Sequence, residues 1–178
     1  MIIKKSKLND CYVIEPKIHG DNRGFFLESF HEARYKEKLN IDYSFVQDNH
    51  SKSTQGVLRG LHYQIKNPQG KLVRVVKGEV YDVAVDLRKT SSTFGKWDAV
   101  YLSEDNEKRF WIPPGFAHGF VVISSEADFE YKCTDYYDPE DENTICWDDV
   151  YLNISWPIDN PIISNKDKKG KNFLDIFK

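Results

Sequence analysis

The chain has 178 residues, of which 40% are hydrophobic and 30% are charged. This length suits one domain spanning residues 1–178, and the composition is that of a globular protein with a hydrophobic core, which excludes a disordered chain. The net charge of −3 argues against nucleic acid as a partner, although a local cluster of arginine and lysine could still bind a phosphate group.

The three cysteines, Cys11, Cys133 and Cys146, share no spacing typical of a metal site or a redox pair. We interpret them as small buried residues of a protein in a reducing cytoplasm. The first five residues lack the apolar run of a signal peptide, and no segment has the length that a membrane span needs. We therefore expect a cytoplasmic protein without a membrane partner.

Strand patterns dominate the chain, and residues 19–26 read as a turn that leads into a strand. Residues 72–87 are rich in β-branched side chains, and Gly78 marks a turn or bulge between two strands there. Two more strands are expected at 97–102 and 116–123. A further strand at 128–134 alternates strictly between polar and apolar residues.

Two helices are expected beside these strands. Residues 31–39 carry Glu32 near the start and Lys36 and Lys38 near the end, which suits the helix dipole. A second, short helix is expected at 171–178. Many short strands separated by turns predict an all-β sandwich or barrel with a few short helices.

The run from Arg59 to Gln64, with the sequence RGLHYQ, is the most informative stretch. On a regular strand His62 and Gln64 would share a face, and Arg59 would point to the other side. A bulge at Gly60 would bring Arg59 and His62 to one cavity. From the alternation alone, His62 could be either a site residue or a core histidine.

Histidine, carboxylate, lysine and tyrosine side chains are the groups needed to move protons beside a ketone. Pattern alone favours Tyr131 as a core aromatic residue and Asp167 as part of a polar loop. Arg23, Arg59 and Lys71 could bind a diphosphate. The paired amides of Gln47 and Asn49 could orient sugar hydroxyls, because amides both donate and accept hydrogen bonds.

Taken in order along the chain, the motifs resemble the dTDP-4-dehydrorhamnose 3,5-epimerase family, a branch of the cupin superfamily. The matching segments include GDNRGFFLESF, FVQDNHSKS, VLRGLHYQ, GKLVRVVKGEVYDVAVDLRK, FWIPPGFAHGF, FEYKCTDYY and SNKD, and they cover nearly the whole chain. The resemblance implies a jelly-roll β-sandwich, a homodimer, and a nucleotide-linked 4-keto-6-deoxy sugar as substrate.

The resemblance also implies roles for particular residues. His62 matches the base, Asp167 its carboxylate partner, Tyr131 the opposed acid, and Lys71 a residue near the keto oxygen. The implied substrate contacts are Arg23, Glu28, Gln47, Asn49, Arg59 and His118. The reaction would invert C3 and C5 through an enolate without a redox step, so no cofactor is expected.

Several alternatives stay open. Relatives often carry an aromatic residue where this chain has His19, so a GDP-linked 4-keto-heptose is an alternative substrate. The same fold also serves 3-epimerases, ketoisomerases and non-catalytic sugar-binding cupins. Metal-binding cupins typically present His-x-His, whereas this chain has His62-Tyr63-Gln64, so we expect no metal. A metal site of His50, His62 and His118 is the alternative.

Overall fold

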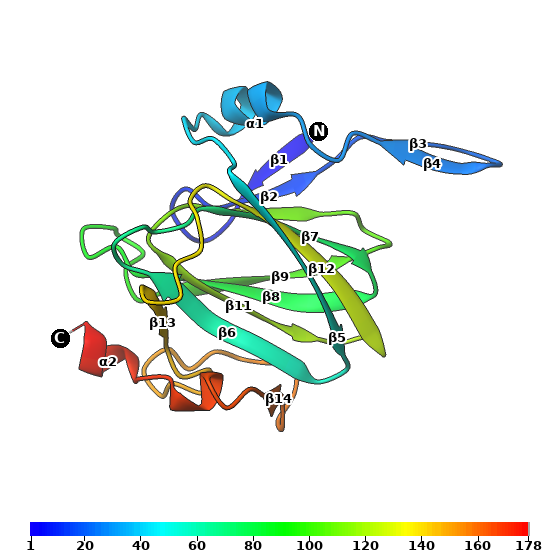
Figure 1. The fold of residues 1–178 in the computed structure, drawn as a ribbon. Helices are drawn as coiled ribbons and strands as arrows, with labels where there is room; N and C mark the ends of the chain where they lie inside the picture. Colours follow the sequence, from blue (N-terminus) through cyan, green and yellow to red (C-terminus); the bar gives the residue numbers. More distant parts are fainter. Residues whose placement is uncertain (178) are drawn as a thin grey trace.

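The computed structural model describes residues 1–177, and β-strands are their main secondary structure (Figure 1). Two helices and one 3-10 turn accompany the strands. In chain order the elements are β1 (Ile2–Lys5), β2 (Tyr12–Glu15), β3 (Ile18–Asp21), β4 (Gly24–Leu27), α1 (Glu32–Leu39), β5 (Gln47–Thr54), β6 (Val57–Gln64), β7 (Lys71–Lys77), β8 (Glu79–Asp86), β9 (Trp97–Ser103), β10 (Arg109–Ile112), β11 (Phe116–Val122), β12 (Glu126–Cys133), β13 (Glu142–Thr144), β14 (Ile162–Ile163), η1 (Asp167–Lys169) and α2 (Phe173–Ile176).

Two sheets face each other and form a jelly-roll β-sandwich. The first has the strand order β1-β2-β10-β7-β12-β5, and the second has the order β13-β6-β11-β8-β9, with β14 pairing beside β6. Several strands that follow each other in the sequence, such as β7 and β8, lie in different sheets. The fold therefore confirms the expected sandwich, and it brings distant segments to the space between the two sheets.

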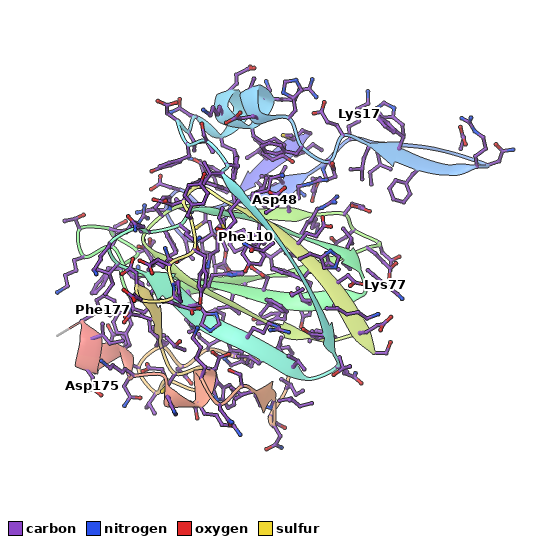
Figure 2. The ribbon with its side chains drawn as sticks, in the orientation of Figure 1. Lys17, Asp48, Lys77, Phe110, Asp175 and Phe177 are labelled. Carbon is purple, nitrogen blue, oxygen red and sulfur yellow. The ribbon has the colours of Figure 1, made fainter. Side chains whose placement is uncertain are left out.

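Hydrophobic side chains fill three layers. The central layer lies between the sheets and includes Val73, Phe110 and Phe129, and Figure 2 labels Phe110 within it. The second layer packs the C-terminal segment, including Phe173, against the outer face of the second sheet. The third packs α1 against the outer face of the first sheet through Tyr35. Strand β11 is covered on both faces, so every residue of its sequence FAHGFVV is buried, whereas β12 alternates between buried and half-buried residues over most of its length.

The local expectations from sequence are confirmed with small shifts of boundary. Gly78 separates β7 from β8 with a φ of 77°, a conformation that glycine adopts without a steric cost. The helix expected at 31–39 begins at Glu32, and the His31 side chain caps it by accepting a hydrogen bond from the Arg34 N–H. The helix expected at 171–178 is a single turn, α2, and residue 178 lies outside the described residues.

One hairpin stands apart from the sandwich. Strands β3 and β4 pair only with each other and project from the body of the molecule (Figure 1). Phe25 and Phe26 of this hairpin are 62% and 71% exposed, which is unusual for large apolar side chains side by side. None of the helices in residues 1–177 is long and apolar enough to cross a membrane.

Candidate active site

Most of the residues expected from sequence to form a site surround one cavity of about 280 Å³. The strands β5, β7 and β12 of the first sheet and β6 and β11 of the second supply them, so the cavity opens between the sheets. The expected residues that line it are Gln47, Asn49, Arg59, His62, Lys71, His118 and Tyr131.

A β-bulge in β6 places two of these side chains on the same side. His62 pairs with His118 and Arg59 pairs with Phe120, so two residues of β6, Gly60 and Leu61, lie opposite one residue of β11. The bulge turns both Arg59 and His62 toward the cavity, and it leaves Leu61 in the outer core. This confirms the bulge predicted at Gly60.

The imidazole of His62 forms a short hydrogen bond with a distant carboxylate. Its Nε2 lies 2.6 Å from Oδ1 of Asp167, the first residue of η1, and the Asp167 side chain is 4% exposed. Burial would raise the pKa of the Asp167 carboxyl, but the hydrogen bond and charge of His62 and the Gly60 N–H hold that pKa below its usual range. A charged Asp167 fixes Nε2 as the protonated nitrogen and leaves Nδ1 as the basic one.

Tyr131 and Lys71 come from the sheet opposite His62. Tyr131 packs its ring against the central core, and burial raises the pKa of its hydroxyl to about 12, so the hydroxyl keeps its proton at neutral pH. The Lys71 Nζ lies 6.0 Å from the centre of that ring. Burial lowers the pKa of Lys71, while the charge of Asp82 acts in the opposite direction. The His62 imidazole and the protonated Tyr131 hydroxyl thus face one cavity from its two sides.

A second histidine–carboxylate pair lies on the wall of the cavity. His118 Nε2 is 2.8 Å from Oδ2 of Asp82, and Asp82 is fully buried. Burial raises the pKa of Asp82 and lowers that of His118. Sequence reasoning did not select Asp82. A signal existed, since Asp82 falls between Val80 and Ala84 on the face of β8 that lines the central core.

The amide groups expected to orient a sugar also lie at the cavity. Gln47 Nε2 donates a hydrogen bond to Oδ1 of Asn49 at 3.0 Å, which fixes both amides on β5. Arg59 donates from Nε to Ser53 Oγ at 3.1 Å and keeps its remaining guanidinium donors for other partners.

Two further cavity residues were not expected from sequence. Glu142 of β13 and Tyr137 of the preceding loop both line the cavity, and the Tyr137 hydroxyl donates to Glu142 Oε2 at 2.7 Å. Glu142 also forms an ion pair with Lys166, the neighbour of Asp167. Glu142 lies in a polar stretch with no local signal, and Tyr137 ends the matching segment FEYKCTDYY without a role implied for it, so the fold reveals their place at the cavity.

Arg23 and Glu28 do not reach this cavity within one chain. Arg23 lies in the turn of the projecting hairpin and donates from Nε to Asp21 at 3.1 Å. Glu28 follows the hairpin and pairs with Arg34 of α1. Their expected contact with substrate stays a prediction.

Each of the three histidines considered as metal ligands forms a hydrogen bond with a different aspartate. His62 bonds Asp167 and His118 bonds Asp82, while His50 lies on the other face of β5 and bonds Asp128 at 3.1 Å. Among residues 1–177, no group of three or more histidine, cysteine or acidic side chains is arranged to hold a metal ion.

Comparisons with known proteins agree with the fold. The family model described as dTDP-4-dehydrorhamnose 3,5-epimerase matches residues 5–175. The enzyme of that name from Shigella flexneri is 54% identical over 98% of this chain and 97% of its own length. A dTDP-6-deoxy-D-glucose-3,5-epimerase from Legionella pneumophila, solved in complex with dTDP-4-keto-L-rhamnose, is also 54% identical, with a TM-score of 0.95 over 99% of this chain and 94% of that one.

A more distant structure is informative for the reaction. A 3'-monoepimerase from Streptomyces bikiniensis, solved in complex with dTDP-quinovose, is 31% identical, with a TM-score of 0.87 over 93% of this chain and 85% of that one. Fold, cavity and matches together define the class of the protein as a sugar-nucleotide isomerase. The chain belongs to the dTDP-4-dehydrorhamnose 3,5-epimerase family.

Proposed function

We propose that this protein inverts C3 and C5 of a dTDP-linked 4-keto-6-deoxy sugar. The observation that carries the proposal is the placement of a paired base, His62 with Asp167, across one cavity from the protonated Tyr131. Inversion requires a proton to leave one face of a carbon and another to arrive on the opposite face. Groups on both sides of the cavity meet that requirement.

The chemistry follows from the acidity of hydrogens beside a ketone. The C4 carbonyl acidifies C3 and C5, and the barrier is the negative charge that develops on its oxygen. His62 takes the proton at Nδ1, and Asp167 stabilises the resulting imidazolium. Lys71, with Arg59 beside the cavity, stabilises the enolate oxygen, and Tyr131 donates a proton to the opposite face at C5. No step transfers an electron or hydride.

The comparisons favour dTDP as the carrier and inversion at both carbons. The relatives at 54% identity are 3,5-epimerases of dTDP sugars, whereas the 3'-monoepimerase is 31% identical. The GDP-linked heptose, the single inversion and the non-catalytic sugar-binding protein therefore serve as the alternatives to be tested. The single inversion is the alternative most similar to the proposed function, since it uses the same base.

Solvent deuterium incorporation tests the function directly. In D2O, with dTDP-4-keto-6-deoxyglucose as substrate, we expect one deuteron at C3 and one at C5, read by mass spectrometry and NMR. A GDP-linked 4-keto-heptose is the comparison substrate. Deuterium at C3 alone would establish a 3-epimerase, a shifted carbonyl would indicate a ketoisomerase, and binding without any exchange would support a sugar-binding protein.

Two variants then test the assigned roles. His62→Ala is expected to lower exchange at both carbons by about 10²–10⁴-fold, the usual contribution of a general base. Tyr131→Phe is expected to impair inversion at C5 and to leave exchange at C3. Equal loss at both carbons in Tyr131→Phe would remove that residue as the C5 acid, and exchange retained in His62→Ala would remove His62 as the base.

We also propose that residues 1–178 form one domain that works as a homodimer in the cytoplasm. The three core layers are continuous with the same two sheets, which supports one domain. The exposed Phe25 and Phe26 support an interface, and Arg23 on that hairpin would then contact substrate in the cavity of a second copy. Free thiols at Cys11, Cys133 and Cys146 suit a reducing compartment.

A further inference from the structure

In the proposed reaction His62 must lose a proton before it can act a second time, and none of Asp167, Lys71, Arg59 and Tyr131 has the role of taking up that proton. Each inversion takes a proton from one face of the sugar and delivers a proton to the other face. A base fixed on one side of the cavity cannot return the proton it has taken. If His62 acts at both carbons, it must release the first proton to solvent before it can accept the second. This inference rests on the proposed function.

Asp167 is poorly placed to carry that proton away. It is 4% exposed and is enclosed by the His62 ring and the Gly60 N–H, and its lowered pKa favours the charged form. A proton passed to Asp167 would stay beside the base. The exit must therefore start from the other nitrogen of the ring, Nδ1.

Glu142 is the group beside Nδ1. Strand β13 pairs with β6 so that Glu142 lies opposite Gln64 and Thr144 lies opposite His62. The Glu142 side chain is 10% exposed, and its Oε1 lies 3.8 Å from Nδ1 of His62. This distance is within the range of an ion pair and beyond that of a hydrogen bond, so formation of the imidazolium would draw the two groups together by under about 1 Å.

The other oxygen of Glu142 leads to the surface. Oε2 accepts a hydrogen bond from the Tyr137 hydroxyl at 2.7 Å and pairs with Lys166. The Lys166 side chain is 54% exposed and Tyr137 is 46% exposed. Glu142 thus faces the half-buried His62 ring through one oxygen and contacts the solvent-facing rim through the other.

We propose that Glu142 resets His62 between the two inversions. The carboxylate takes the proton from Nδ1 after the first abstraction and releases it to water at the rim formed by Tyr137 and Lys166. The proton delivered to the opposite face of the sugar comes ultimately from solvent, so one proton leaves and one enters in each inversion. Because Glu142 acts through His62 and not on the sugar, it is a positioning and relay residue rather than a catalytic one.

The variant Glu142→Gln tests the relay, because the amide has nearly the same shape but cannot take up the proton. Rapid-quench measurements in D2O follow the first and second deuterons that enter the dTDP-linked sugar. We expect the first to enter at a rate within about twofold of the wild type and the second to slow by at least about tenfold. A singly inverted, singly deuterated sugar should accumulate.

Rescue by small buffer molecules distinguishes a proton relay from a purely structural role of Glu142. Formate or imidazole at increasing concentration should restore the second inversion in Glu142→Gln and leave the wild type unchanged, because a diffusing base replaces the missing carboxylate. Glu140→Gln is the matched control, since Glu140 is exposed in the same segment and faces solvent. It should behave as wild type at both carbons.

The outcomes separate the relay from the function on which it rests. Equal slowing of both inversions, an unchanged rate of the second, or no rescue by buffer would each show that Glu142 only fastens β13 to Lys166, and would overturn the relay. Absence of exchange in the wild type would overturn the proposed function itself. If Glu142→Gln does not fold, Glu142→Asp keeps an ionisable group set back from His62 and should show a smaller delay of the second inversion.

Discussion

At the residue scale, burial shifts the pKa of several ionisable groups in and beside the cavity in directions that suit proton transfer. Tyr131 is held neutral with a pKa of about 12, which suits a proton donor. Burial also raises the pKa of Asp82 and lowers the pKa of Lys71 and of His118. These shifts arise because a charge loses its hydration when it enters a site between two packed sheets.

The lowered pKa of Lys71 predicts where activity is lost at high pH. In the proposed reaction Lys71 would stabilise the enolate only when protonated, and its pKa lies below the ordinary 10.5. Activity should therefore fall as the pH rises through this lowered pKa, before Tyr131 ionises near 12. Lys71→Arg should move the alkaline limb of the kcat/KM profile upward, because arginine stays charged above pH 12. A limb at the same pH in both proteins would assign it to another group.

At the scale of elements, the bulge in β6 is what combines Arg59 and His62 into one site. It depends on Gly60, whose φ is 129°. A Cβ at this position would lie 2.5 Å from the Gly119 Cα and 2.9 Å from the His118 carbonyl oxygen on the neighbouring strand. Backbone atoms of a central strand cannot move aside, so glycine is required both for its conformation and for close approach.

Gly60→Ala is therefore expected to be strongly destabilising. Gly24→Ala is the matched control, because Gly24 has nearly the same φ, 126°, and a Cβ there meets nothing within 4 Å. The control should cost about 1–3 kcal/mol for backbone strain. Gly60→Ala should cost about 1–3 kcal/mol more because of the clash. Urea unfolding at one protein concentration measures the difference, and equal losses would show that the close approach does not matter.

At the scale of the whole molecule, the projecting hairpin is the feature that the sandwich does not explain. Exposure of the two phenylalanine side chains to water is unfavourable, and burying them against a second copy would stabilise an assembly. The hairpin would also carry Arg23 away from its own chain and toward another cavity.

The double variant Phe25→Ser, Phe26→Ser is expected to weaken the proposed homodimer and shift the protein toward monomer in sedimentation velocity. The sandwich should stay folded, because neither side chain belongs to a core layer. Val150→Ser is the control, since Val150 is 91% exposed and lies far from the hairpin in sequence. A double variant that remains dimeric, with an unchanged KM, would contradict both the interface and the contact of Arg23 with substrate.

Local patterns in the sequence are enough to predict part of the secondary structure. Alternation, turn glycines and helix ends depend on residues a few positions apart, and so the strands within 72–87, 97–102, 116–123 and 128–134, α1 and the bulge at Gly60 follow from the sequence, whereas β1, β2, β10, β13 and β14 were not expected. The strand pattern predicted a sandwich or barrel, and the family resemblance specified a jelly-roll sandwich and seven of the residues that line the cavity. Nothing within the motif RGLHYQ identifies the carboxylate that completes the base.

Contacts between side chains far apart in the chain depend on the tertiary structure. The resemblance implied that Asp167 is the partner of His62, but nothing in its own polar stretch distinguishes it, and 105 positions separate it from the His62 ring that it contacts at 2.6 Å. Asp82 and Glu142 enter the site in the same way, through strand pairings of β8 with β11 and of β13 with β6. The physical reason is that hydrogen bonds and desolvation depend on distances of a few ångströms, and in a β-sandwich pairing between distant strands sets those distances.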